Sequence, residues 1–121
     1  MNQQTILKEY ISIHDKYIDT YGENTVVLME VGSFFEIYAV INDKINIGPD
    51  IYHICQNVLQ ISVTKRNKKI REISEKNYLQ AGFPNVSVQK YENILLNHNY
   101  TVVIVEDIVD KSIYSGNWMM Y

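Results

Sequence analysis

Apolar side chains recur at intervals of three and four along the first twenty residues, as on one face of an amphipathic helix. This pattern predicts a helix over about residues 5–21, and Gly22 follows where a helix commonly ends in a left-handed residue. The stripe consists of Ile6, Leu7, Tyr10, Ile11, His14, Tyr17, Ile18 and Tyr21. We expect His14 to be a packed residue rather than a metal ligand, because no second His or Cys lies at ligand spacing.

Two short runs rich in β-branched and aromatic residues come next. Residues 26–31 are almost wholly apolar and predict a buried strand, and residues 34–40 predict a second strand. Gly32-Ser33 separates them and is typical of a turn. Two strands split by two residues indicate a hairpin or one bent strand.

The middle of the chain alternates between polar and apolar segments. Residues 42–44 are expected to form a loop, and Pro49-Asp50 resembles the start of a helix. The apolar stripe of that helix is Ile51, Ile54, Cys55, Val58 and Leu59. Residues 61–64 predict a strand, and residues 65–76 a polar loop or short exposed helix.

The last third predicts a strand, a helix and a strand. The strand over residues 78–83 is expected to stop at Pro84. Asn85 or Ser87 could cap a helix reaching about Asn97, and residues 100–106 predict a second buried strand. Residues 1–110 are therefore assigned to one domain, and residues 111–121 to a tail or linker toward a following domain.

This order of elements predicts an α/β (α+β) fold. The predicted order is helix, strand, strand, helix, strand, strand, helix, strand. This order implies a mixed β-sheet flanked by about three helices. A chain of 121 residues has room for one core of ordinary size.

Composition narrows the class of protein. Hydrophobic residues make up 46% and charged residues 21%, which excludes a disordered or fibrous chain. No apolar run is long enough to span a membrane, and the N-terminus lacks the pattern of a signal peptide. Cys55 is the single cysteine, which excludes an intrachain disulfide and a four-cysteine zinc site. We therefore expect an intracellular, reducing compartment: cytoplasm, or an organelle or viral factory.

Charge is unevenly distributed along the chain. The net charge of -3 argues against a strongly basic nucleic-acid binder. Residues 64–76, however, contain six basic and two acidic side chains, a local net charge of +4. The remainder of the chain therefore has a net charge of -7. The basic ones are Lys65, Arg66, Lys68, Lys69, Arg71 and Lys76. Local potential decides where a polyanion binds, so this stretch is either a nucleic-acid contact or an ordinary solvated loop.

The second strand places its side chains alternately on two faces. Phe35, Ile37 and Ala39 form an apolar face, whereas Phe34 and Glu36, together with Tyr38, form the other. A carboxylate is seldom buried without a partner, so we expect the Glu36 face to meet solvent or a ligand. Phe34 is then either an exposed aromatic or an ordinary core residue.

Sequence motifs for phosphate-binding loops, serine hydrolases, zinc proteases and C-x-x-C redox proteins are absent. Carboxylates do lie on or next to predicted strands, namely Glu30, Glu36, Glu106 and Asp107. Glu36 or Glu106 with Lys65 could imitate a metal-dependent nuclease site, which is kept as an alternative. A further alternative is a protein-interaction module that docks through the apolar tail or an exposed Phe34.

Four motifs in order resemble one known family. They are Gly32-Ser33-Phe34-Phe35-Glu36, Thr64-Lys65-Arg66, Ala81-Gly82-Phe83-Pro84, and the strand ending at Glu106. Over about residues 10–106 the chain is similar to the N-terminal mismatch-recognition domain (domain I) of the DNA mismatch repair protein MutS. Departures from the family pattern include Ser33 for Asp, a rearranged segment at residues 41–50, and Asn85-Val86 for Tyr-His.

The resemblance implies a function for individual residues. Phe34 would insert into the duplex at a mispaired or unpaired base, and Glu36 would hydrogen-bond the displaced base. Lys65 and Arg66, with Lys68 and Lys69 of the basic stretch, would hold the DNA backbone.

The resemblance also implies partners. The partner would be mismatched double-stranded DNA, with no membrane, and the full-length protein would be a dimer. ATP hydrolysis belongs to another part of the family's chain, so this chain is expected to be no enzyme and to hold no cofactor. ATP and magnesium are expected only in the full-length protein.

Overall fold

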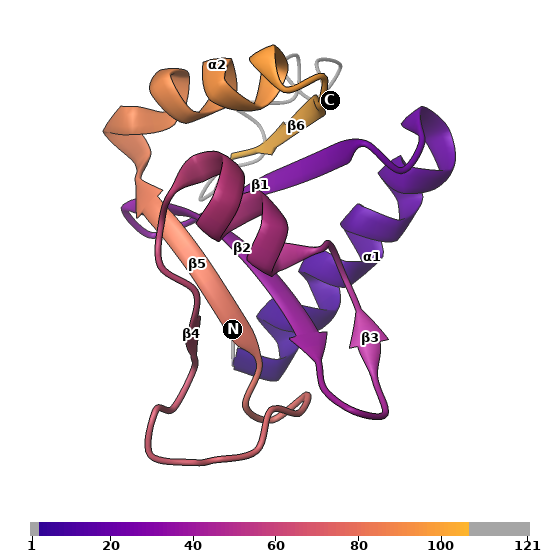
Figure 1. The fold of residues 1–121 in the computed structure, drawn as a ribbon, viewed down its shortest axis with the longest axis vertical. Coiled ribbons are helices and arrows are strands. Elements are labelled where there is room, and N and C mark those ends of the chain that lie inside the picture. Colours follow the sequence, from indigo (N-terminus) through magenta and orange to yellow (C-terminus); the bar gives the residue numbers. More distant parts are fainter. Residues whose placement is uncertain (1–2, 107–121) are drawn as a thin grey trace, which may run out of the picture.

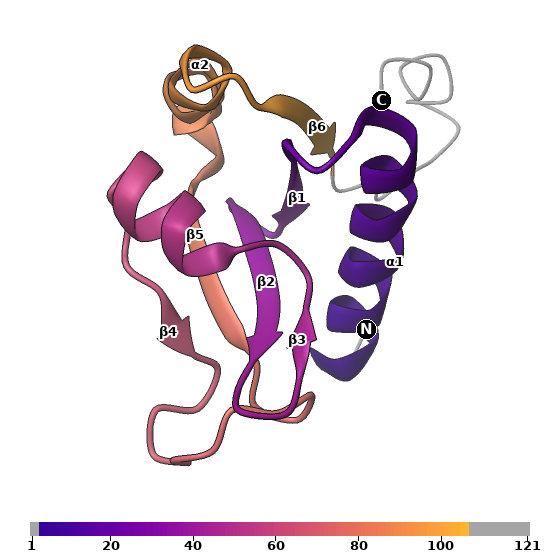
Figure 2. The same ribbon diagram turned by 45° about the vertical axis from the view of Figure 1, so that its right-hand side comes forward.

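A mixed sheet lies between two helical layers in the computed structural model, which describes residues 3–106. Helix α1 (Gln3–Tyr21) covers one face (Figures 1 and 2). The other face is covered by the π-type helical segment η1 (Tyr52–Leu59) and by α2 (Val88–Asn97), which contact each other. This arrangement confirms the predicted α/β class with a mixed sheet and flanking helices.

The described strands form one sheet in the order β4-β5-β2-β1-β6, with β3 paired to β2. They are β1 (Thr25–Val31), β2 (Phe34–Ile41), β3 (Asn46–Ile47), β4 (Thr64–Lys65), β5 (Leu79–Pro84) and β6 (Thr101–Val105). β1 and β6 are parallel and every other described pair is antiparallel, so β1 and β2 form a hairpin, one of the two arrangements predicted for them.

Helix α1 follows its apolar stripe. Leu7 and Tyr10 are buried against the sheet, and the Tyr10 hydroxyl donates a hydrogen bond of 2.8 Å to the Val27 carbonyl oxygen. His14 is only 7% exposed, which confirms the packed role expected for it. The helix ends at Gly22 with a φ of +101°, as the sequence predicted.

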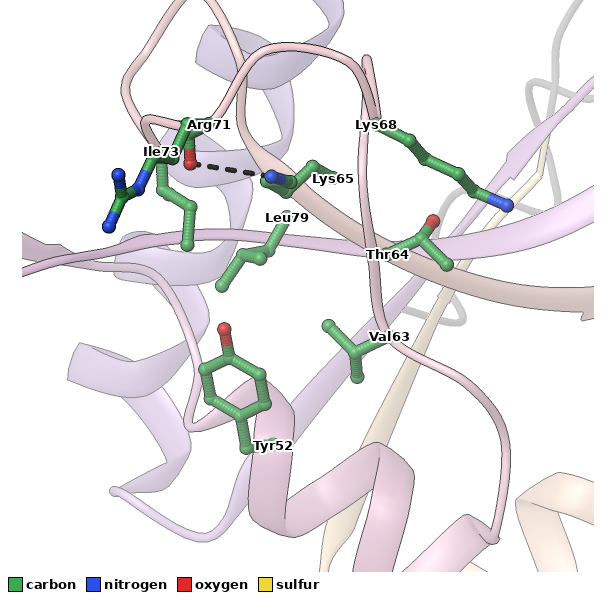
Figure 3. A pocket seen from close by; sticks show the side chains of 8 residues that line it. All are labelled: Tyr52, Val63, Thr64, Lys65, Lys68, Arg71, Ile73 and Leu79. Atoms are coloured by element: carbon green, nitrogen blue, oxygen red, sulfur yellow. Dashed lines mark hydrogen bonds between the residues drawn. The ribbon is translucent and has the colours of Figure 1, made fainter.

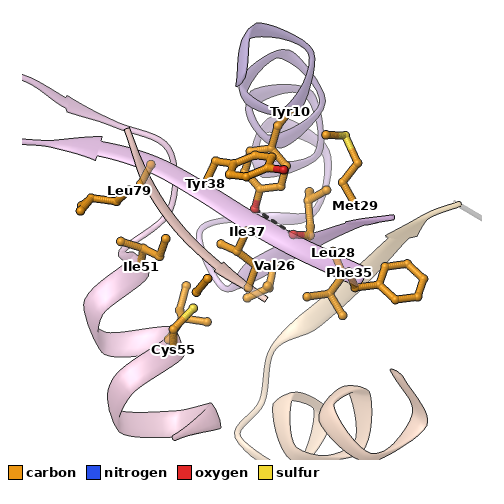
Figure 4. Packing of buried hydrophobic residues seen from close by; sticks show 14 of the residues in the cluster. Tyr10, Val26, Leu28, Met29, Phe35, Ile37, Tyr38, Ile51, Cys55 and Leu79 are labelled. Atoms are coloured by element: carbon orange, nitrogen blue, oxygen red, sulfur yellow. Dashed lines mark hydrogen bonds between the residues drawn. The ribbon is translucent and has the colours of Figure 1, made fainter. Parts of the chain in front are cut away.

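The core fills both sides of the central strands (Figure 4). On the side of η1 and α2, Phe35 and Ile37 pack with Leu28 and Cys55. Burial raises the pKa of the Cys55 thiol to about 12, as expected of a cysteine in an apolar core.

The middle segments differ from the sequence prediction. No strand was predicted between the loop expected at residues 42–44 and the helix start expected at Pro49-Asp50, but the two-residue strand β3 lies there. Of the strand predicted over residues 61–64, only Thr64 is paired, and it continues to Lys65. Ile61 and Val63 pack partly against the core, so their apolar character reflects packing rather than strand pairing.

The end of strand β5 also differs from the prediction. Pro84 is the last residue of the strand, whereas the strand was expected to end before it. Proline is tolerated there because the last residue of a strand need not donate a ladder hydrogen bond through its N–H. A short 3-10 turn, η2 (Asn85–Ser87), then leads into α2. Ser87 precedes α2 but makes no side-chain capping bond, and Asn85 uses its side chain elsewhere. Strand β6 is only partly buried, and the predicted tail lies outside residues 3–106.

Candidate nucleic-acid interface

A two-residue turn joins β1 to β2 and carries Phe34 at its exit. Gly32 has a φ of +61°, as the first central residue of a type II′ hairpin turn requires. Val31 pairs with Phe34 across the hairpin, so Phe34 is the first residue of β2. The turn therefore places Phe34 at the tip of the sheet.

Phe34 and Phe35 have opposite environments although they are neighbours. Phe34 is 45% exposed, whereas Phe35 is 4% exposed. Phe35 packs against Phe83 of β5, with ring centroids 6.1 Å apart. Phe34 is thus a surface aromatic and not a core residue.

Glu36 and Tyr38 share the Phe34 face, and exposure falls along it. Glu36 is half-buried and Tyr38 is buried. The prediction that this face meets solvent is right at Phe34 and wrong at Tyr38, because α1 covers that end through Tyr10. The Tyr38 hydroxyl donates a hydrogen bond to Glu36 Oε1.

Gly82 lies directly opposite Glu36 on β5. A Cβ atom there would come within 2.7 Å of the Phe35 carbonyl oxygen and 3.2 Å of Glu36 Cγ. No side chain larger than hydrogen fits without displacing the backbone. The glycine of the Ala-Gly-x-Pro motif therefore gives the Glu36 side chain its room.

Asn85 ties the hairpin turn to the end of β5. Its backbone N–H donates to the Ser33 carbonyl oxygen at 2.8 Å, and its side-chain amide donates to Glu30 Oε2 at 2.9 Å. Sequence reasoning noted Asn85 as a departure from the family and a possible helix cap, but missed this contact. The only indication of this contact in the sequence is the polar side chain directly after the Ala-Gly-x-Pro motif.

The basic stretch divides between the two faces of the sheet. Arg66 lies on the Phe34 face, where its guanidinium donates to Gln80 Oε1 at 3.3 Å. Lys65 pairs with Leu79 and lies on the opposite face, where its Nζ donates to the Arg71 carbonyl oxygen at 3.3 Å. The sequence prediction grouped these two neighbours, and the structure separates them.

Asn77 organises the loop that follows β4, and the sequence analysis did not single it out. Its side chain is buried, and Oδ1 accepts a 2.7 Å hydrogen bond from the backbone of Asn67. Its amide donates to the carbonyl oxygens of Ile70 and Glu72 at 3.1 and 2.8 Å. Lys68 and Lys69 are exposed within this loop.

An open pocket of about 410 Å³ lies beside the basic stretch, on the η1 side (Figure 3). Its lining combines apolar and cationic side chains: Tyr52, Val63, Thr64, Lys65, Lys68, Arg71, Ile73 and Leu79. Lys68 and Arg71 point to opposite sides of it (Figure 3). The side chains therefore do not converge on one point.

Phe34 and the basic stretch occupy different ends of the sheet. Phe34 pairs with Pro84, whereas Lys65 pairs with Leu79 and Leu79 with Ala39. Ala39 lies five positions after Phe34 on β2, which is roughly 17 Å along a strand. A ligand that touches both must be extended.

The carboxylates considered for a nuclease site do not gather. Glu30 pairs with Phe35 and so lies on the face opposite Glu36, and Asp107 falls outside residues 3–106. Within those residues no group of three His, Cys, Asp or Glu side chains could hold a metal ion. In the same range no helix is long and apolar enough to cross a membrane.

The fold and site define a small α/β domain that presents an aromatic and a carboxylate beside a hairpin turn. The family described as MutS domain I matches residues 4–119. The chain is 28% identical over 110 residues to a mutS homolog of Acanthamoeba polyphaga mimivirus. It is also 28% identical over 104 residues to the DNA mismatch repair protein MutS of Streptococcus pneumoniae (strain Hungary19A-6). These alignments cover 89% and 86% of this chain, but 9% and 10% of the relatives.

The chain therefore belongs to the MutS domain I family, the family of mismatch-recognition domains. It spans about a tenth of the length of these relatives.

Proposed function

We propose that this chain recognises mismatched double-stranded DNA by inserting Phe34 at a mispaired or unpaired base, with Glu36 hydrogen-bonding that base. One observation carries the proposal: the Phe34 ring is exposed at the hairpin tip, on the same face as a half-buried carboxylate. Family membership supplies the ligand class, and the mimiviral and streptococcal relatives are named for mismatch repair.

An exposed phenylalanine suits this task physically. Inserting a side chain between base steps costs a few kcal/mol of unstacking, and less where the pair is already unstable. Stacking of a base on an aromatic ring returns about 1–3 kcal/mol. Phe34 has no hydrogen-bonding atom that would prefer one base, so the free-energy balance depends on the stability of the base pair.

Glu36 adds selectivity by a different route. A carboxylate close to phosphates is repelled unless it accepts a hydrogen bond from a base N–H, or is protonated and donates to a ring nitrogen. A fully paired duplex offers no such partner at the insertion point. Glu36 therefore disfavours matched DNA and is satisfied at a mismatch.

The remaining parts of the proposal concern the backbone and the longer protein. Lys65, Arg66, Lys68 and Lys69 contribute a salt-dependent, sequence-independent contact to phosphates. The longer protein acts as a dimer within the cell, and ATP and magnesium bind a part of it that lies outside this chain. This domain itself holds no cofactor and performs no catalysis.

The test is Phe34→Ala in the full chain, measured as affinity for matched duplexes and for duplexes with one mispaired or unpaired base. We expect the preference for the mismatch to fall about tenfold or more, because the stacking is lost. The free energy of unfolding should change by less than about 1 kcal/mol, because the ring is a surface group.

Val86→Ala is the matched control, since Val86 is an 88% exposed apolar residue two positions after the strand residue that pairs with Phe34. It should leave the mismatch preference in place. Retained preference in Phe34→Ala, or unfolding of that variant, contradicts the proposal. Cleavage of DNA by the pure protein with magnesium would support the nuclease alternative instead.

A further inference from the structure

Glu36 is held by a residue of its own strand. Tyr38 lies two positions further along β2, on the same face, and its hydroxyl donates to Glu36 Oε1. One carboxylate oxygen is thus engaged within the domain, and Oε2 is the oxygen that Tyr38 leaves open to a ligand.

The donor is fixed in place by its surroundings. Tyr38 is 2% exposed, and its ring makes edge-to-face contacts with Tyr10 of α1 and with Tyr78, at centroid distances of 5.3 and 5.2 Å. Edge-to-face packing on two sides of a buried ring restricts its movement. Figure 4 shows Tyr10 and Tyr38 packed together beneath helix α1.

The hydroxyl also stays a donor at every ordinary pH. Burial raises the pKa of Tyr38 well above its usual value, and the neighbouring Glu36 raises this pKa further. The phenol therefore keeps its proton, and the carboxylate always finds a donor there.

The opposite strand leaves the carboxylate space to lie in this position. Gly82 pairs with Glu36, and a Cβ at residue 82 would sit 3.2 Å from Glu36 Cγ. The Glu36 side chain can therefore lie against the backbone of β5 while its carboxylate reaches Tyr38.

From these contacts we infer that Tyr38 is a positioning residue that fixes the Glu36 carboxylate before DNA binds. It holds one oxygen, so that the other is directed to the displaced base at no further cost in side-chain entropy. This inference rests on the proposed role of Glu36 in mismatch recognition.

The test is Tyr38→Phe, which keeps the packed ring and removes the hydroxyl alone. In the full chain we expect the mismatch preference to fall about three- to tenfold, as freeing one side chain implies. Nuclear magnetic resonance couplings about χ1 of Glu36 should change from one rotamer to an average. Tyr17→Phe is the matched control: it removes the hydroxyl of another buried tyrosine of α1, whose ring stacks on Tyr21, and should leave preference and couplings unchanged.

A double-mutant cycle separates the inference from the function on which it rests. In a Glu36→Ala background, Tyr38→Phe should have no further effect on mismatch preference. If Glu36→Ala alone leaves the preference intact, the proposed role of Glu36 fails. If Glu36→Ala lowers the preference but Tyr38→Phe does not, or if its effect persists without Glu36, the positioning role fails and the proposed function stands.

Discussion

At the scale of the residue, position on the strand decides what a side chain does. Phe34 and Phe35 have the same chemistry, yet one is exposed and the other lies in the core, because strand alternation sends them to opposite faces. Glu30 and Glu36 are likewise both carboxylates of the hairpin but lie on opposite faces. This pair offers a direct test of the repulsion attributed to Glu36.

Glu36→Gln should raise the affinity for fully matched duplex, by about three- to tenfold, because the charge facing the phosphates is removed. Glu30→Gln removes the same charge from the other face and keeps an amide oxygen that accepts the hydrogen bond from Asn85, so it should leave that affinity unchanged. Binding of both variants to matched and mismatched oligonucleotides at one salt concentration gives the measurement. An unchanged or lower affinity of Glu36→Gln for matched DNA contradicts the repulsion mechanism.

At the scale of the element, the hairpin that presents Phe34 is fastened at its turn. Asn85 reaches this turn from the other end of β5 with its backbone N–H on Ser33 and its amide on Glu30. A free hairpin tip would fray, and the proposed insertion of Phe34 requires a rigid tip. The hairpin that carries Phe34 is braced by Asn85, a residue 55 positions away from Glu30 in sequence.

Asn85→Ala should lower the free energy of unfolding by about 1–2 kcal/mol, because a part-buried hydrogen bond to a carboxylate is removed. Chemical denaturation measures this, and Asn93→Ala, at an exposed position of α2, serves as the control. Combination with Glu30→Ala should be clearly non-additive. Additive effects would show that Asn85 does not stabilise the hairpin through Glu30.

At the scale of the whole molecule, the sheet holds the two parts of the proposed DNA site apart. Phe34 lies at one end of β2 and the basic stretch at the other, roughly 17 Å away along the strand. That span corresponds to about five nucleotides at 3.4 Å per step along one strand. A single duplex is therefore long enough to span both ends, as the proposed insertion of Phe34 and the proposed phosphate contacts of the basic stretch require.

Neutralising Lys65, Arg66 and Lys68 together should flatten the plot of log affinity against log salt, by about 0.9 for each phosphate that the domain no longer neutralises. Titrations at several salt concentrations measure this slope. A triple Gln variant at Lys8, Lys16 and Lys90, on the helices, provides a control of equal charge. A slope unaffected by the first triple variant means that the basic stretch faces away from DNA.

Single substitutions then show which face the duplex follows. Arg66 and Lys65 are neighbours on opposite faces, and only Arg66 shares the face of Phe34. If the duplex lies along the Phe34 face, we expect the single variant Arg66→Gln to account for the change in the slope of log affinity against log salt.

Much of the fold was determined by local pattern. The spacing of apolar residues is enough to predict α1 and its end at Gly22, and alternation is enough to place Phe34 and Glu36 on one face. The ordered motifs likewise led to the correct family. These features depend on residues close together in the chain, so they can be read without knowing what packs where.

The tertiary structure decided everything that depends on which elements meet. Alternation put Tyr38 beside Glu36, but only the packing of Tyr10 and Tyr78 buried it and made it a fixed donor. Strand register placed Gly82 opposite Glu36, and the pairing of β5 with β2 brought Asn85 within hydrogen-bond distance of Glu30. Such contacts join residues far apart in sequence, and no local periodicity encodes them.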